Sequence, residues 1–303
     1  MVSSMHELPS RADLSIDISS ATLDADAAAA CCSLLPGWSA IRPADCTVSK
    51  ISGGITNILV KVAPPKPLEP VALRVFGENT ELIIDREQEL RTIVEINRGG
   101  FGAHILGTFA NGRIESFLYG ETLAPGDMAL PGVFPSVARR LAAFHSLDVG
   151  GVTRAEACFE SIGRWLDMAE GLDFSDSPAK ARQFASLDFA AMRREVASAR
   201  ALCGRCHSPL AWSHNDLLSG NIMLLHGKKP GDPDLGPRDV QFIDFEYGSY
   251  NPRGFDLGNH FNEWAGFDCD YSLFPSLPIQ RQFLRHYLEE AEGFLRQASR
   301  LAG

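Results

Sequence analysis

The sequence predicts an α+β fold of two lobes, a small β-rich lobe followed by a larger, mainly helical lobe. From about residue 45 to residue 118, short segments alternate β-branched with polar residues, which is the period of half-buried strands. After residue 119 the apolar residues recur at helical spacing instead. A chain of 303 residues is long enough to build both lobes.

Five strands and one helix are predicted in the small lobe. Alternation predicts strands at residues 46–51, 58–62, 71–76, 103–109 and 113–118. The last two are joined by Asn111-Gly112, which favours a tight hairpin turn. Apolar residues at helical spacing, separated by charges, predict a helix over residues 81–96.

Helices dominate the second lobe. Periodic apolar residues predict helices at residues 135–147, 158–171, 179–202 and 279–301. Two short strands, 221–225 and 240–244, flank a loop at 226–238 that is rich in Gly, Pro, Asp and Lys.

This order of lobes is the layout of the protein-kinase-like fold, and it divides the chain into three parts. The first residues are rich in Ser and Asp, so we expect residues 1–40 to form a mobile tail. Residues 41–118 are expected to form the N-terminal nucleotide-binding lobe. Residues 119–303 then form the C-terminal catalytic and substrate lobe.

Composition limits the classes of function. A net charge of −10 and a pI near 5.3 argue against a nucleic-acid scaffold, whose surface would be basic. The same charge does not oppose a cationic substrate such as an amine. No run approaches the roughly 18 consecutive apolar residues of a membrane helix. The N-terminus also lacks a basic start followed by an apolar stretch, so we expect no membrane span and no secretion signal.

Cysteine usage favours a cytoplasmic protein. The seven cysteines are scattered, which suits a reducing compartment better than a disulfide framework. Cys203-Gly-Arg-Cys206-His207 has the spacing of a covalent haem attachment site. Because that chemistry requires export, we expect ordinary thiols near the end of a helix.

Three polar residues in the second lobe have the spacing of a phosphoryl-transfer site. Asp216 precedes Asn221 by five residues, and Asp244 ends an apolar run. A kinase needs a carboxylate to accept the proton of the attacking hydroxyl, and an Asn and a second Asp to hold the Mg²⁺ that bridges the ATP phosphates. We therefore expect Asp216 to be the general base and Asn221 and Asp244 to be magnesium ligands. The alternative is that Asp216 merely caps a turn.

Neighbouring residues are expected to support this catalytic loop. His214 and Asn215 precede the base, where they are expected to brace the loop rather than react. Asp256 lies at a predicted helix start, where a carboxylate meets free backbone amides. We expect it to brace the same loop.

The turn between the first two predicted strands is the candidate cover for the ATP phosphates. Gly53 and Gly54 let backbone amides approach an anion closely, and Thr56 and Asn57 complete the turn. The alternative is an ordinary β-turn, because a Gly-Gly hairpin is weak evidence by itself.

Other residues of the small lobe are expected to contact ATP as well. Arg74 takes the place where protein kinases put a phosphate-contacting Lys, and Glu89 on the following helix is expected to pair with it. The alternative is a surface salt bridge. The junction between the lobes, including Phe117 and Leu118, is expected to present backbone groups to adenine.

A carboxylate among aromatic residues is the candidate amine site. Glu263 and Trp264 lie at the end of a predicted helix, and Tyr247, Phe267 and Tyr271 lie nearby in the sequence. Such a group can receive an ammonium by charge and by cation–π contact. The alternative is that the aromatic residues pack in the core.

At these residues the chain resembles the choline/ethanolamine kinase family, from about Ile51 to Leu288. The matching segments lie at residues 51–57, 73–77, 85–90, 120–123, 214–221, 243–250, 253–263 and 269–275. The resemblance implies a kinase that uses ATP and magnesium to phosphorylate the hydroxyl of a small amino alcohol, the first step of the route to phosphatidylethanolamine or phosphatidylcholine.

Two segments favour ethanolamine over choline within the family. Leu217-Leu218 after the predicted base, and the stretch beginning Gly120-Glu121, look more like ethanolamine kinases. The alternatives are a choline kinase, a kinase of the same fold acting on an aminoglycoside or homoserine, and a nucleotide-binding protein without turnover. The nucleotide-binding alternative is considered because relatives in the family continue with further C-terminal helices, and no segment of this sequence resembles them.

Overall fold

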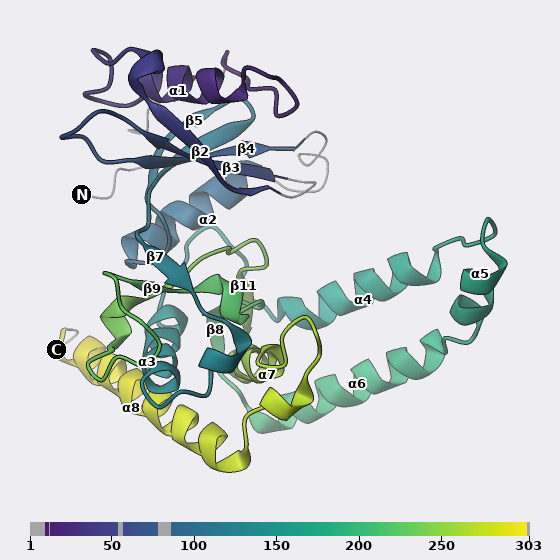
Figure 1. Cartoon of the computed structure of the whole chain (residues 1–303). Helices are drawn as coiled ribbons and strands as arrows, with labels where there is room; N and C mark the ends of the chain where they lie inside the picture. The colour runs from purple at the N-terminus through teal and green to yellow at the C-terminus, as the bar shows by residue number, and fades with distance from the viewer. Residues whose placement is uncertain (1–9, 12, 54–56, 78–85, 302–303) are drawn as a thin grey trace.

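The computed structural model describes residues 10–11, 13–53, 57–77 and 86–301. A β-rich lobe lies above a larger, mainly helical lobe, and the chain passes between them after the last strand of the upper sheet (Figure 1). The predicted α+β two-lobe fold is confirmed. The boundary between the two predicted lobes stays a prediction.

One mixed sheet forms the upper lobe, in the order β1-β5-β6-β4-β3-β2. Its strands are β1 (Ser10–Arg11), β2 (Thr47–Gly53), β3 (Asn57–Ala63), β4 (Val71–Phe76), β5 (Ile105–Phe109) and β6 (Gly112–Ser116). The five predicted strands are therefore present as β2–β6. The sixth, β1, pairs parallel with β5 through Ser10 and Thr108, and at two residues it is too short for any sequence pattern.

Helix α1 (Leu23–Leu34) corrects the prediction of a tail over residues 1–40. Its alanine and cysteine side chains, among them Ala27, Ala30 and Cys31, are buried against the sheet. The side chain of Asn111 ties the preceding segment down, because it donates to the carbonyl of Ile16 at 2.8 Å and accepts from its amide at 3.0 Å. Helix α2 (Arg86–Arg98) covers the opposite face (Figure 1).

The lower lobe combines helices with two small sheets, β10-β9-β7 and β11-β8. Its strands are β7 (Gly120–Thr122), β8 (Leu210–Ser213), β9 (Ile222–Leu225), β10 (Val240–Phe242) and β11 (Ser249–Pro252). Its helices are α3 (Val133–His145), α4 (Ala157–Glu170), α5 (Pro178–Ala185), α6 (Phe189–Cys206), α7 (Arg253–Glu263) and α8 (Leu277–Leu301). Single 3₁₀ turns lie at Pro43–Asp45, Pro125–Asp127, Ser219–Asn221, Pro237–Asp239 and Tyr271–Leu273.

The predicted helix over residues 179–202 is two helices. Helix α5 ends at Ala185, and α6 begins after Asp188, whose carboxylate accepts a hydrogen bond from the amide of Ala191 at 2.7 Å. An Asp in this position satisfies a backbone donor that the helix start leaves unpaired. The apolar period continues across the break, so periodicity alone does not reveal it.

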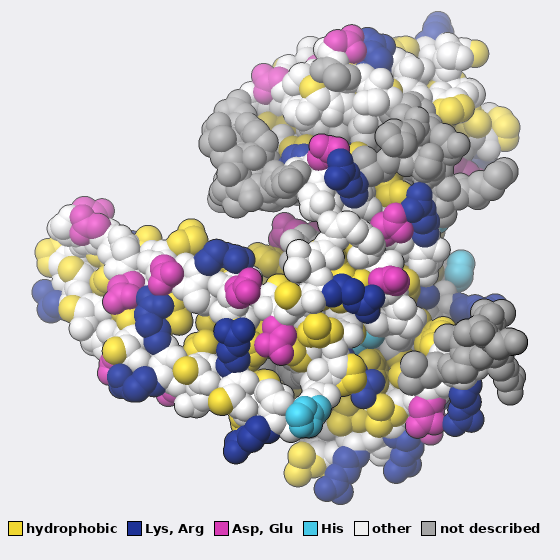
Figure 2. Space-filling model, turned by 180° about the vertical axis from the view of Figure 1, so that it is seen from behind, with side chains coloured by type: hydrophobic (Ala, Val, Ile, Leu, Met, Phe, Trp, Pro, Cys, Tyr) yellow, Lys and Arg dark blue, Asp and Glu magenta, His cyan; other side chains and the backbone are white. Residues whose placement is uncertain are grey.

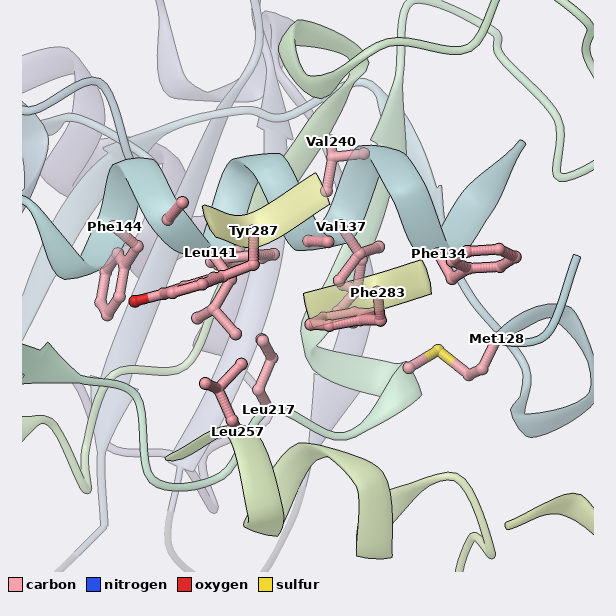
Figure 3. Packing of buried hydrophobic residues seen from close by; sticks show 14 of the residues in the cluster. Met128, Phe134, Val137, Leu141, Phe144, Leu217, Val240, Leu257, Phe283 and Tyr287 are labelled. Carbon is pink, nitrogen blue, oxygen red and sulfur yellow. The ribbon is translucent and has the colours of Figure 1, made fainter. Parts of the chain in front are cut away.

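The core of the lower lobe lies between α3 and α8. Phe283 and Tyr287 of α8 are 0% and 2% exposed, and they pack against Val137 and Leu141 of α3 (Figure 3). Leu217 of the loop after β8 joins the same cluster at 0% exposed. The predicted catalytic loop is therefore built directly on this core.

Helices α4, α5 and α6 form an arm that projects from the lower lobe (Figure 1). Between residues 157 and 206, all of which the structure describes, Cys158 alone is buried. Hydrophobic side chains and charges of both signs are mixed over its surface (Figure 2). The thiols of Cys203 and Cys206 are free and exposed near the end of α6.

Within the described ranges, none of the helices has the length and apolar character that crossing a bilayer requires.

A neutral histidine, His260, is buried beside the core between α3 and α8. The side chain of His260 is 0% exposed, its Nδ1 lies 2.8 Å from the carbonyl of Leu217, and Trp264 Nε1 donates to its Nε2 at 3.3 Å. Both ring nitrogens of a neutral imidazole are then satisfied. Burial lowers the pKa of His260 to about 4.

We expect this histidine to make stability fall in mildly acidic solution. Because its pKa is lower in the folded chain than the 6.5 of an ordinary His, the unfolded chain takes up the proton first. The free energy of unfolding should therefore lose about 3 kcal/mol from this group as the pH falls from 7 to 4. Urea unfolding of wild type and His260→Gln checks this, with exposed His104→Gln as control. An equal decline in all three proteins would contradict it.

Candidate active site

A cavity of about 210 Å³ lies between the two lobes. Leu59 and Ala72 of the sheet line its upper wall, and Met223 and Ile243 line its lower wall. The predicted adenine contacts Phe117 and Leu118 lie at its edge, where the chain passes from one lobe to the other. Apolar walls above and below with a polar rim suit a flat aromatic base.

The loop after β8 is held by one buried carboxylate. Asp256, in the first turn of α7, accepts hydrogen bonds from the amides of His214 at 2.8 Å and Asn215 at 2.7 Å. Asn215 has a left-handed backbone with φ of 65°, which an Asn adopts more readily than most residues. Asp216 follows directly, so its place depends on these bonds.

The loop and the end of β10 bring the predicted catalytic residues together. Asn221 Nδ2 donates to the carbonyl of Asp216 at 2.8 Å and to its Oδ2 at 3.1 Å. Burial, followed by the negative charges of Glu263 and Asp244, raises the pKa of Asp216 to about 6. Asp244 and Glu263 must therefore lie close to Asp216, in one site. A base with this pKa is well placed for proton transfer near neutral pH.

This site suits a divalent cation that a phosphate-bearing ligand helps to hold. The amide oxygen of Asn221 and the carboxylate of Asp244 are hard oxygen donors, and after burial the negative charges of Glu263 and Asp244 contribute to the raised pKa of Asp216. No group of three His, Cys, Asp or Glu in the described part of the chain forms a complete metal site. Magnesium fits such a sparse donor set, because it is commonly bound by one or two carboxylates plus substrate phosphates.

Glu246 belongs to the site, and the sequence interpretation missed it. Its side chain lines the cavity, and burial and the charge of Asp244 raise its pKa. Arg74 opposes that rise. The available signal was its position two residues after Asp244, in the short turn that follows β10.

The predicted ion pair between Arg74 and Glu89 is wrong. Glu89 accepts hydrogen bonds from Arg113 Nη1 at 2.9 Å and Arg86 Nη1 at 2.6 Å. Arg74 Nε instead lies 3.7 Å from Glu115 Oε1, a carboxylate that also accepts from Arg113 Nε at 2.5 Å. The cause is the strand register, which sets Arg74 directly opposite Arg113. The sequence does not show that Arg113, rather than its neighbour Arg74, pairs with Glu89.

Of the two arginines on the sheet, Arg74 has the weaker contacts with carboxylates, because Arg113 pairs closely with both Glu89 and Glu115. Arg74 lines the cavity, and its Nε is buried without a hydrogen-bond partner among the described residues. A buried donor without an acceptor is costly, and an anion in the cavity would supply one.

The predicted phosphate cover lies partly outside the described residues. Gly54 and Thr56 are not among them. Gly53 ends β2 and Asn57 begins β3, and Gly53 pairs with Ile58 across the two antiparallel strands. The turn therefore connects adjacent strands at one end of the sheet.

The structure separates the predicted amine-binding residues. Glu263 is half-buried and close enough for its charge to raise the pKa of Asp216. Tyr247 is 49% exposed, and burial and the charges of Glu246 and Asp216 raise its pKa. Trp264 does not line the site, because its indole is 1% exposed in the core.

Phe267 and Tyr271 are also not assembled into an aromatic cage. They are 93% and 69% exposed, and no ring contact joins either of them to another described residue. Within the described chain, Glu263 and Tyr247 are thus the predicted amine contacts that lie beside the base.

A cavity between the lobes, bordered by this acidic cluster, defines a phosphotransferase of protein-kinase-like fold. The choline/ethanolamine kinase family model matches residues 48–301, so the chain belongs to that family. It is 40% identical over 262 residues to a probable ethanolamine kinase of Arabidopsis thaliana, covering 86% of this chain and 67% of that protein. It is 36% identical over 259 residues to probable ethanolamine kinase A of Dictyostelium discoideum, covering 84% and 70%.

A solved ethanolamine kinase of Plasmodium vivax has a similar structure. The TM-score is 0.70 at 31% identity, and the match covers 83% of this chain and 70% of the other. The predicted resemblance to the family is therefore confirmed both by sequence and by fold.

We expect the buried arginine of the small lobe to be essential for its stability. Arg113→Gln removes the guanidinium that Glu89 and Glu115 share, which should lower the free energy of unfolding by about 3–5 kcal/mol. Arg91→Gln is the control, because its pair with Glu87 is exposed and should contribute at most about 1 kcal/mol. Urea unfolding measures both. Equal losses would contradict a buried network.

Proposed function

We propose that this chain transfers the γ-phosphoryl group of ATP to the hydroxyl of ethanolamine and releases phosphoethanolamine and ADP. The observation that carries the proposal is the meeting of Asp216, Asp244 and Glu263 in one acidic site beside the cavity. Membership of the choline/ethanolamine kinase family supports the same reaction. The product would be the first intermediate on a route to phosphatidylethanolamine.

Each step uses a named group of this chain. Asp216 accepts the proton of the substrate hydroxyl while that oxygen attacks the γ-phosphorus, and ADP leaves with the electrons of the broken P–O bond. Asn221 holds the carboxylate of Asp216 in position. Arg74 donates to phosphate oxygens from the sheet. Asn221 and Asp244 would hold Mg²⁺, which supplies neutralisation of the charge on the β- and γ-phosphates.

The acidic cluster accounts for an ammonium-bearing acceptor. Glu263 places a carboxylate beside the general base, so an ammonium bound there would bring a hydroxyl two carbons away towards Asp216. A primary ammonium offers three N–H donors to this carboxylate and to the half-exposed Tyr247, whereas a quaternary ammonium offers none. This difference favours ethanolamine over choline. It agrees with the preference predicted from Leu217-Leu218, although Leu217 itself lies in the core.

Use of magnesium and a cytoplasmic location belong to the same proposal. The first follows from the donor set of Asn221 and Asp244. The second rests on the cysteine usage of the sequence.

We expect Asp216→Asn to abolish transfer and spare nucleotide binding. Removal of a general base should lower kcat by roughly 10²–10⁴-fold, while ATP affinity changes little because the walls of the cavity remain. A coupled ADP-release assay measures kcat, and calorimetry measures ATP binding. Asp268→Asn, an exposed carboxylate after α7, is the control and should keep full activity. An active Asp216→Asn protein would refute the assignment of the base.

We expect Glu263→Gln to affect the amine more than the nucleotide. Loss of one charged hydrogen bond of about 1.5–3 kcal/mol should raise the KM for ethanolamine by roughly 10- to 100-fold, with a much smaller rise for ATP. The control is Glu160→Gln, an exposed carboxylate on the arm. Steady-state kinetics with each substrate varied in turn checks this, and similar rises in both KM values would count against Glu263 as the ammonium acceptor.

The choice of amine is tested by supplying ethanolamine and choline side by side. We expect a higher kcat/KM for ethanolamine, because only its ammonium can donate hydrogen bonds to Glu263. A higher value for choline would replace the proposed substrate with a quaternary amine. Magnesium-dependent ATP binding without transfer to either amine would instead identify a nucleotide-binding protein without turnover.

A further inference from the structure

A continuous line of buried polar groups connects α8 with the catalytic loop. The hydroxyl of Tyr287 lies 2.7 Å from Nδ1 of His145, and Nε2 of the same ring lies 2.9 Å from Oδ2 of Asp256. Asp256 in turn accepts the amides of His214 and Asn215. The side chains of His145 and Asp256 are 3% and 0% exposed, so water does not compete for these bonds.

The members of this line come from three helices that are far apart in the sequence. His145 ends α3, Asp256 lies in the first turn of α7, and Tyr287 lies in the middle of α8. Tyr287 extends over α3 with its hydroxyl towards the end of that helix that carries Phe144 (Figure 3). The packing of α8 on α3 thus decides where the hydroxyl lies.

The donors and acceptors of Tyr287, His145 and Asp256 allow one consistent assignment of their protons. Asp256 stays a carboxylate, because hydrogen bonding from His145 and the two loop amides outweighs burial and lowers its pKa. A carboxylate only accepts, so Nε2 of His145 carries the proton that faces it. Nδ1 is then an acceptor for the hydroxyl of Tyr287, which stays protonated because burial raises the pKa of Tyr287 to about 12. The tyrosine therefore selects the tautomer that the carboxylate needs.

We propose that Tyr287 and His145 are positioning residues for the general base, acting through Asp256. The inference rests on the proposed function, since it assigns Asp216 as that base. Tyr287 holds the tautomer of His145, the imidazole holds the rotamer of Asp256, and the carboxylate holds the two amides that precede Asp216. A displacement of about 1 Å at a reacting group can cost on the order of 10²-fold in rate, so each bond contributes to turnover without contacting substrate.

The alternative is that these bonds stabilise the core without acting on the loop. A matched variant separates the two. Tyr250 is also fully buried, and its hydroxyl accepts from the amide of Val149 at 2.9 Å and lies 3.2 Å from Oδ1 of Asp148, neither of which bonds to Asp256. Tyr250→Phe therefore removes a buried hydroxyl together with its hydrogen bonds, as Tyr287→Phe does, and leaves the line from Tyr287 to the loop intact.

The experiment compares Tyr287→Phe, His145→Gln and Tyr250→Phe in the full chain. We expect Tyr287→Phe to lower kcat about tenfold and to change the KM of ATP and of ethanolamine less than about twofold. Gln can keep a donor towards Asp256, so His145→Gln should lose less activity than His145→Ala. Tyr250→Phe should lower the melting temperature to a similar degree and leave kcat unchanged. Equal kcat values for Tyr287→Phe and Tyr250→Phe would overturn the proposal.

A second measurement does not depend on the substrate. Hydrogen–deuterium exchange of the peptide containing residues 213–218 should become faster in Tyr287→Phe than in Tyr250→Phe, because the amides of His214 and Asn215 lose a fixed acceptor. Unchanged exchange would overturn the positioning role. If wild type does not phosphorylate ethanolamine, the proposed function fails, and exchange alone then decides whether the line positions the loop.

Discussion

The structure depends above all on one buried negative charge, the carboxylate of Asp256. A charge that is fully removed from water must be compensated by several donors, and here they come from α3 and from two consecutive loop amides. Satisfying this one group fixes the loop relative to two helices. The positions of Asp216 and Asn221 follow from that constraint.

The two lobes present opposite charges to the cavity. In the small lobe, Glu89 and Glu115 neutralise Arg113 between strand and helix, and this leaves Arg74 to face the cavity. Below the cavity, burial and then the charges of neighbouring carboxylates raise the pKa values of Asp216 and Glu246. The cleft therefore pairs a donor for anions above with acceptors for cations below. A magnesium nucleotide and an ammonium substrate together would balance both halves.

Sequence patterns identified what depends on local chemistry. The strands β2–β6 alternate clearly, and the spacing of Asp216, Asn221 and Asp244 places them at strand and loop ends that the fold brings together. Helix α1 was missed because an Ala/Cys run has little polar contrast between its faces. The partner of Glu89 and the burial of Trp264 depend on strand register and on core packing, which a single sequence does not encode locally.

The projecting arm has a different energetic character from the rest of the lower lobe. Since its helices bury almost nothing, little free energy couples them to the core, and a segment of this kind opens locally without unfolding its surroundings. The loop at Asp216 is instead tied to the most deeply packed helices. Insertions or deletions in the arm would thus be tolerated during evolution while the chemistry stays intact, so this is the part of the fold freest to diverge in length.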